Sequence, residues 1–170
     1  MLTILILAAG ASSRMQGRDK LTLPINGLPM LAVTIQRAQA TRCPVLVALR
    51  PDAPTRAAIV VECGAAPITV RDADHGMGVS IATATAARPK GTNAVMILPA
   101  DMPALTTQDL LVMKDAWDAA PKESILRGVS VEGRPGHPVI FPSACFDALE
   151  ALTGHEGARS VIDDHDGPVI

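Results

Sequence analysis

The sequence predicts a three-layer α/β/α domain in which a mostly parallel sheet is covered by helices on both faces. Short, almost wholly apolar runs recur along the chain, as is typical of strands covered on both faces. Segments with apolar residues at helical spacing separate these runs, as right-handed βαβ connections require. With 170 residues, 48% of them hydrophobic and 19% charged, the chain can enclose one core, so we expect a single domain over 1–170.

The expected elements alternate along the chain, beginning with an apolar run that precedes a loop rich in glycine and serine. Strands are expected at 2–9, 43–50, 67–70, 93–100, 123–129 and 137–141. Helices are expected at 29–40, 55–63, 79–87, 107–119, 142–152 and 156–165. Pro29 suits the first turn of its helix, and Thr106 or Thr107 can cap the helix that begins at 107.

Composition and charge exclude several classes of partner. The net charge is −2, with 15 basic and 17 acidic residues, so there is no general basic surface for nucleic acid or an anionic membrane. Aromatic residues make up 2% of the chain, too few for the stacking platforms of single-stranded nucleic-acid binders. No apolar run reaches the length of a membrane span, and the opening MLTILILAAG is expected to form a strand rather than a signal peptide. Cys43, Cys63 and Cys145 are widely spaced and odd in number, which indicates reduced thiols and a cytoplasmic protein.

The loop after the first strand, LAAGASSRMQGRDK (7–20), lies at the carboxyl end of a strand, where ligands bind in a parallel sheet. Its small residues let the backbone approach a ligand and direct N–H groups at phosphate oxygens. Arg14 offers phosphate a fork of donors and Lys20 a mobile point charge, so a polyphosphate is the expected ligand. The loop has neither the GxGxxG spacing of dinucleotide-binding proteins nor the GK[ST] of a Walker loop. The alternative is an ordinary loop that carries two basic residues.

Three further motifs indicate a ligand site. LPADMP (98–103) puts the carboxylate of Asp101 at the tip of an apolar strand, where it can bind a divalent cation that bridges phosphates or can serve as an ordinary turn aspartate. HGMGVS (75–80) has two glycines that permit close backbone approach before a helix, and it also suits an ordinary helix start. GRPGHPVIF (133–141) delivers His137 to the start of a strand, where it can meet an anionic acceptor or can be merely exposed.

In their order along the chain, these motifs resemble those of the molybdenum cofactor nucleotidyltransferase family, and most nearly its cytidylyltransferase branch. The motifs that carry the resemblance are LAAGASSRM (7–15) with Lys20, GMGVS (76–80), ADMP (100–103), GHP (136–138) and GHEGAR (154–159). The resemblance implies a Rossmann-like fold of the nucleotide-diphospho-sugar-transferase type. The sequence departs from the family pattern at His155, where aspartate is usual, and at Gln16, where glycine is usual.

The resemblance also implies an activity, the magnesium-dependent transfer of CMP from CTP to a phosphorylated acceptor with release of pyrophosphate. The implied acceptor is molybdenum cofactor (molybdopterin), and a molybdoenzyme client is an implied partner. Ala8-Ala9-Gly10 resembles the cytidine-using branch, so CTP is expected in preference to GTP. Two alternatives stay open. One is a nucleotidyltransferase for a sugar phosphate or another small-molecule phosphate, and the other is a non-catalytic chaperone that binds molybdenum cofactor.

Residue roles carry over from the family position by position. Arg14, Lys20 and Asp101 are the expected catalytic residues, and Asp101 is the expected ligand of Mg²⁺. The expected nucleotide-binding residues are Leu7, Ala8, Ala9, Gly10, Ser12, Ser13, Arg14, Lys20, Gly76, Met77, Gly78 and Ser80. The expected acceptor-binding residues are Arg134, Gly136, His137 and Pro138.

Overall fold

The computed structural model describes residues 1–10, 19–155 and 157–170, and its centre is a six-stranded sheet in the order β5-β4-β1-β6-β8-β7. The strands of this sheet are β1 (Leu2–Leu7), β4 (Val45–Leu49), β5 (Ala66–Thr69), β6 (Ala94–Pro99), β7 (Leu126–Val129) and β8 (Pro135–Pro142). A separate small hairpin pairs β2 (Pro24–Ile25) with β3 (Leu28–Pro29). The central strands β1, β4 and β6 are buried along nearly their whole length, which explains why they are apolar except for Thr3.

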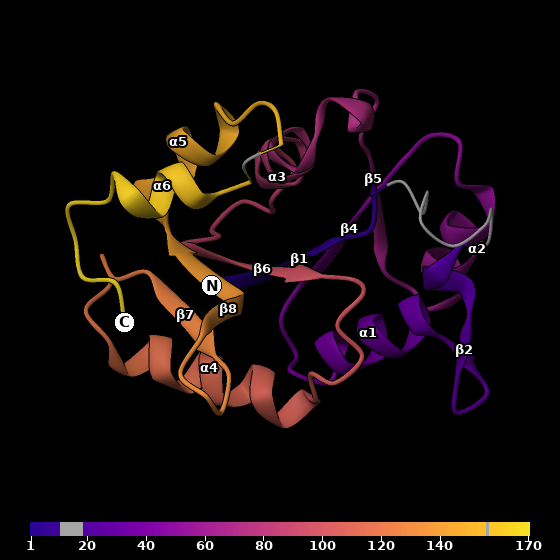
Figure 1. Ribbon diagram of the computed structural model, residues 1–170, viewed down its shortest axis with the longest axis horizontal. Coiled ribbons are helices and arrows are strands. Elements are labelled where there is room, and N and C mark those ends of the chain that lie inside the picture. The colour runs from indigo at the N-terminus through magenta and orange to yellow at the C-terminus, as the bar shows by residue number, and fades with distance from the viewer. Residues whose placement is uncertain (11–18, 156) are drawn as a thin grey trace.

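Helices cover both faces of the sheet, so the predicted three-layer arrangement is confirmed (Figure 1). One face carries α1 (Met30–Gln39), α2 (Pro54–Glu62) and α4 (Thr107–Ala119). The other carries α3 (Met77–Ala86), α5 (Phe146–Glu150) and α6 (Arg159–Asp163). Short 3₁₀ helices are η1 (Lys20–Thr22), η2 (Ala73–His75) and η3 (Ser143–Cys145). Alternate residues of each strand enter the two apolar clusters, one beneath each helical layer.

Strand direction decides which loops share an edge of the sheet. β5, β4, β1 and β6 run parallel, whereas β8 runs antiparallel to both β6 and β7. The beginning of β8 therefore lies at the same edge as the ends of β1, β4 and β6. This edge collects the loops that follow Leu7 and Pro99 together with the segment that leads into Val139.

Several predicted boundaries differ from the structure. The helix expected at 142–152 begins one residue later, because β8 continues as far as Pro142. It consists of η3 followed directly by α5. The helix expected at 156–165 is described over Arg159–Asp163 only. α3 begins at Met77, two residues earlier than expected, because Gly76 with φ 116° is its N-cap. Pro29 is likewise the N-cap of α1 and not a residue of its first turn.

The start of α4 confirms a capping prediction. The Thr106 hydroxyl accepts a hydrogen bond from the Asp109 backbone N–H, and the Asp109 carboxylate accepts one from the Thr106 backbone N–H. The bond from the Thr106 backbone N–H, and then one that the Thr106 hydroxyl donates to the same carboxylate (2.8 Å), lower the pKa of Asp109. The cap fixes where the chain turns after Asp101 and enters α4. Among the described residues, no helix is both long and apolar enough to cross a membrane.

Candidate active site

Lys20 and Asp101 lie side by side at the carboxyl edge of the sheet. Lys20 is the first residue of η1, and Asp101 lies two residues after the end of β6. The intervening Ala100 is tied to β1 by a hydrogen bond from its N–H to the Leu7 carbonyl (3.1 Å). The Lys20 Nζ and an Asp101 carboxylate oxygen are 3.4 Å apart, and the side chains are 43% and 55% exposed. Residues 81 positions apart thus present a cationic donor and a hard oxygen ligand to solvent at one place.

The first glycine-rich loop leaves β1 directly beside this pair. Ala8 and Ala9 are buried, and the Ala8 N–H donates to the Ala48 carbonyl of β4 (2.9 Å). Gly10 is exposed, and a Cβ there would meet no described atom within 4 Å. The structure therefore places the backbone of Gly10 where a ligand can reach it. Three predicted phosphate ligands of this loop, Ser12, Ser13 and Arg14, lie outside the described residues.

Arg56 of α2 reaches this loop from beneath and was not anticipated from the sequence. Its Nε and Nη2 donate to the two carboxylate oxygens of Asp19 (2.6 and 2.9 Å). Its Nη1 donates to the Ala8 and Gly10 carbonyls (2.5 and 3.0 Å). The signal in the sequence is slight, a single arginine in the otherwise largely apolar helix expected at 55–63.

A second arginine, Arg50, ties the loop after β4 to the loop that precedes α3. Its guanidinium bonds the carboxylates of Asp52 (2.8 Å) and Asp74 (2.6 Å). The bond with Asp52, and then that with Asp74, raises the pKa of Arg50 still further, and the same pairing lowers the pKa of Asp52. Asp74 lies in η2, so this bridge restrains the segment that leads into Gly76.

Gly76 and Gly78 pack against the backbone of the motif at 154–159. The Gly78 N–H donates to the Gly154 carbonyl (2.9 Å). A Cβ on Gly78 would lie 2.7 Å from the Thr153 carbonyl oxygen, and a Cβ on Gly76 would overlap the Gly154 carbonyl. Two predicted motifs far apart in the chain therefore meet, and close backbone packing alone accounts for both glycines.

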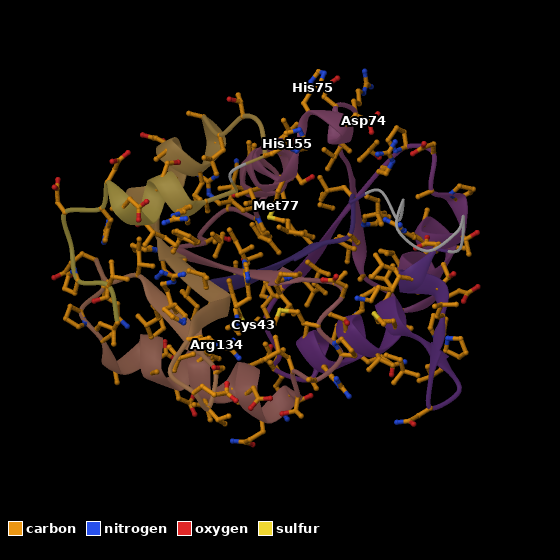
Figure 2. The ribbon with its side chains drawn as sticks, in the orientation of Figure 1. Cys43, Asp74, His75, Met77, Arg134 and His155 are labelled. Atoms are coloured by element: carbon orange, nitrogen blue, oxygen red, sulfur yellow. The ribbon has the colours of Figure 1, made fainter. Side chains whose placement is uncertain are left out.

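The remaining predicted residues of this segment lie in different surroundings. Ser80 is buried within α3, whereas Met77 is 46% exposed. Figure 2 shows Met77 and His155 together on the α3 side of the sheet. Met77 therefore faces solvent beside the motif at 154–159 and is accessible to a ligand.

Replacing Gly76 with alanine is expected to destabilise the fold by at least about 2 kcal/mol. The new methyl group would collide with the Gly154 carbonyl, and φ of 116° is a conformation that L residues rarely adopt. Urea unfolding followed by circular dichroism measures the loss. Gly91→Ala is the matched control, because φ there is 83° but no described atom lies within 4 Å of the added Cβ, so about 1 kcal/mol is expected. Equal losses in the two variants would contradict the packing explanation.

On the acceptor side, the structure brings His137 together with Arg127. Val139 of β8 faces the apolar cluster beneath α3, α5 and α6, and alternation along the strand places His137 on the same face. Arg127 of β7 is opposite Val139 in register and shares that face. The Arg127 Nε is buried and has no hydrogen-bond partner among the described residues. Arg127 was not predicted as a site residue, because the run at 123–129 indicates only an ordinary strand.

Arg134 does not join this group. It is 80% exposed, and its guanidinium pairs with the Glu132 carboxylate (3.5 Å) within the hairpin between β7 and β8. Figure 2 shows Arg134 on the α4 side of the sheet, away from Met77 and His155. Gly136 and Pro138 flank His137; Gly136 is partly buried and Pro138 is buried. The predicted acceptor residues around His137 therefore lie beside Arg127, whereas Arg134 does not.

The electrostatics connect the acceptor side with Asp101. Burial lowers the pKa of His137 below its ordinary range, the charge of Arg127 lowers it further, and Asp101 opposes both. The lowered pKa favours the neutral form of the His137 imidazole. The fixed positive charge at this end of the site belongs to Arg127 and not to the histidine.

The donor set suits a metal that arrives together with phosphate. Among the described residues, no three His, Cys, Asp or Glu side chains are grouped to form a metal cage. Mg²⁺ keeps several waters and commonly binds through one or two carboxylates together with substrate phosphates. The exposed carboxylate of Asp101 beside Lys20 fits this mode of binding.

Known proteins resemble this chain over nearly the whole of its 170 residues. The chain is 33% identical to the purine catabolism protein PucB of Bacillus subtilis (strain 168) over 165 residues, 92% of this chain and 78% of PucB. The structure of Rv0371c from Mycobacterium tuberculosis H37Rv has a TM-score of 0.83 and 25% identity, covering 99% of this chain and 84% of that one. The manganese complex of Rv0371c has a TM-score of 0.79 and 24% identity, covering 99% and 85%. A nucleotidyl transferase from Methanothermobacter thermautotroptrophicus has a TM-score of 0.79 and 18% identity, covering 99% and 87%.

These similarities confirm the predicted Rossmann-like fold of the nucleotide-diphospho-sugar-transferase type. Residues 4–169, nearly the whole chain, match the family described as the MobA-like NTP transferase domain. The motifs at the carboxyl edge and the similarity to PucB agree with that match. The chain therefore belongs to the MobA-like NTP transferase family and is a nucleotidyltransferase.

Proposed function

We propose that this nucleotidyltransferase transfers CMP from CTP to a phosphorylated acceptor, with Mg²⁺ as cofactor and molybdenum cofactor as acceptor. The observation that carries the proposal is the pair formed by Lys20 and Asp101, 3.4 Å apart and exposed at the carboxyl edge. A cation and a hard oxygen ligand at one point are what a metal-bound triphosphate requires.

In the proposed reaction, an acceptor phosphate oxygen attacks the α-phosphorus of CTP in line. The bond from that phosphorus to the bridging oxygen breaks, and pyrophosphate leaves with the bonding electron pair. A phosphate monoester is ionised at neutral pH, so the chain need not supply a strong base. Lys20 offsets charge that develops on the leaving pyrophosphate, and the chain acts mainly by placement and charge neutralisation.

Asp101 is the residue that would hold Mg²⁺. When bound, the ion neutralises phosphate charge and orients the phosphate oxygens. The manganese complex of Rv0371c supports a divalent metal in this fold. Arg14, Ser12 and Ser13 remain proposed phosphate ligands, alongside the backbone of Gly10.

The preference for CTP over GTP rests on the resemblance of Ala8-Ala9-Gly10 to the cytidine-using branch. The Ala9 side chain is 2% exposed and packs in the apolar cluster beneath α3. Its methyl group therefore acts on base choice through the packing of the loop and not through direct contact with the base. Gly76, Met77 and Gly78 are proposed to border the nucleoside.

The acceptor is proposed to bind beside His137 and Arg127. Arg127 offers a positive charge on the face where the neutral form of His137 is favoured, which suits the phosphate monoester of the acceptor. Arg134, exposed and paired with Glu132, is proposed only as a contact at the rim.

The test is pyrophosphate release by the purified chain with Mg²⁺, CTP or GTP, and purified molybdenum cofactor. Release that requires the acceptor and is faster with CTP is the expected result. Release with a sugar phosphate in place of molybdenum cofactor would overturn the acceptor. No release with any acceptor, from folded protein that binds molybdenum cofactor, would favour the chaperone alternative.

A further inference from the structure

We infer that Arg56 is a positioning residue, which holds Lys20 in place for phosphate binding through Asp19. This inference rests on the proposed role of Lys20 at the nucleotide phosphates. Arg56 itself is not expected to touch the phosphates, because its side chain is 4% exposed and its guanidinium is bonded to Asp19 and to the carbonyls of Ala8 and Gly10. Any effect it has on ligand binding must pass through the groups that it holds.

Arg56 connects the two sides of the loop that begins after β1. On one side it donates to the carbonyls of Ala8 and Gly10, and on the other it forms a bidentate pair with the Asp19 carboxylate. A bidentate arginine–carboxylate pair fixes orientation as well as distance. The described residues on either side of 11–18 are therefore held by a single side chain of α2.

Asp19 passes this restraint directly to Lys20. Asp19 is the N-cap of η1, and its carboxylate accepts a hydrogen bond from the Leu21 N–H (3.1 Å). Its carbonyl accepts from the Thr22 N–H (3.0 Å) and from the Thr22 hydroxyl (2.8 Å). Leu21 is buried in the apolar cluster beneath α1 and α2. The single turn that carries Lys20 is thus held by Asp19 on one side and by the core on the other.

Lysine cannot replace arginine in this role. One ammonium group cannot bond both Asp19 oxygens and also the Ala8 and Gly10 carbonyls, whose arrangement matches the planar fork of arginine. Arg56→Lys keeps the buried positive charge opposite Asp19, so it weakens the alignment without leaving the carboxylate unpaired. It is the conservative variant for the test.

The test is a double-mutant cycle on the binding of inorganic pyrophosphate, measured by titration calorimetry in Mg²⁺ on the full chain. Arg56→Lys and Lys20→Ala are each expected to weaken binding about tenfold. In the Lys20→Ala background, Arg56→Lys is expected to weaken it by no more than about threefold, because the group that Arg56 positions is gone. A merely structural role for Arg56 would give equal effects in both backgrounds.

Arg88→Lys is the matched control. Arg88 pairs with Glu150 and lies 4.1 Å from the centre of the Phe146 ring, so it joins α3 to α5 away from Lys20. It is expected to lower the unfolding temperature and to leave pyrophosphate affinity unchanged. Should Arg56→Lys not fold, Asp19→Asn, which keeps a capping side chain, takes its place in the same cycle.

The outcomes separate the inference from the proposed function. Pyrophosphate that fails to bind the unaltered chain would overturn the proposed function of the site. Normal binding with additive losses in the cycle, or with no loss in Arg56→Lys, would overturn only the role of Arg56. Non-additive losses with an unaffected Arg88→Lys would support both.

Discussion

Asp101→Ala is expected to lower the rate of pyrophosphate release about a hundredfold or more while the fold persists. The carboxylate is 55% exposed, and its one polar contact among the described residues is the exposed pair with Lys20. Its removal therefore costs little stability but deprives Mg²⁺ of its proposed protein ligand. Initial rates at saturating CTP over a range of Mg²⁺ concentrations measure the loss.

Asp118→Ala is the control for that variant, because it removes an exposed carboxylate that pairs with Lys114 along α4 (3.0 Å). Its rate is expected to match that of the unaltered chain. Near-normal turnover of Asp101→Ala at ordinary Mg²⁺ concentrations would contradict the proposed metal site. Unfolding curves of both variants show whether the fold has been kept.

Lys20→Ala is expected to lower kcat by a similar factor, about a hundredfold or more. The reason is that a preorganised donor to the leaving pyrophosphate contributes roughly 3–4 kcal/mol in the transition state. Since the charge on pyrophosphate grows as the bond breaks, kcat should fall more than KM rises. Steady-state kinetics with varied CTP measure the two separately.

Lys114→Ala is the matched variant, removing a partly exposed lysine that pairs with Asp118 on α4. It is expected to leave both constants unchanged. A Lys20→Ala enzyme whose KM rises with kcat intact would mean that Lys20 binds CTP equally in the ground and transition states. Turnover close to that of the unaltered chain would remove Lys20 from the site.

The part of the fold that the sequence predicts well is the part governed by burial. β1, β4 and β6 are apolar except for Thr3 because helices cover both faces, and each lies within two residues of its expected limits. The hairpin of β2 and β3 was missed although Asn26 and Gly27, both with positive φ, form its two-residue turn. Its strands of two residues are too short to show any alternation.

In the candidate site too, residues in local motifs were predicted, and residues whose roles depend on tertiary contacts were missed. Lys20 and Asp101 were predicted because each sits in a motif directly after an apolar strand, and the structure brings them together. Arg56 and Arg127 were missed because their roles depend on which helix or strand lies beside the loop, a tertiary fact with no local signature. Gly76 was expected to permit close backbone approach, but that the approaching backbone is that of Gly154 depends on a contact across the fold.

The reversed direction of β8 has a consequence for how such a site can diversify. The proposed nucleotide half lies at the loops that leave β1 and β6, whereas the proposed acceptor half lies beside a hairpin that enters β8 from outside the parallel strands. That hairpin is open to solvent, with Val131 fully exposed at its tip. Insertions there would enlarge one wall of the proposed site without shifting η1, which carries Lys20, or β6, which leads to Asp101. Under the proposed function, a change of acceptor would require a change in this one surface loop, while the residues proposed for the triphosphate stay in place.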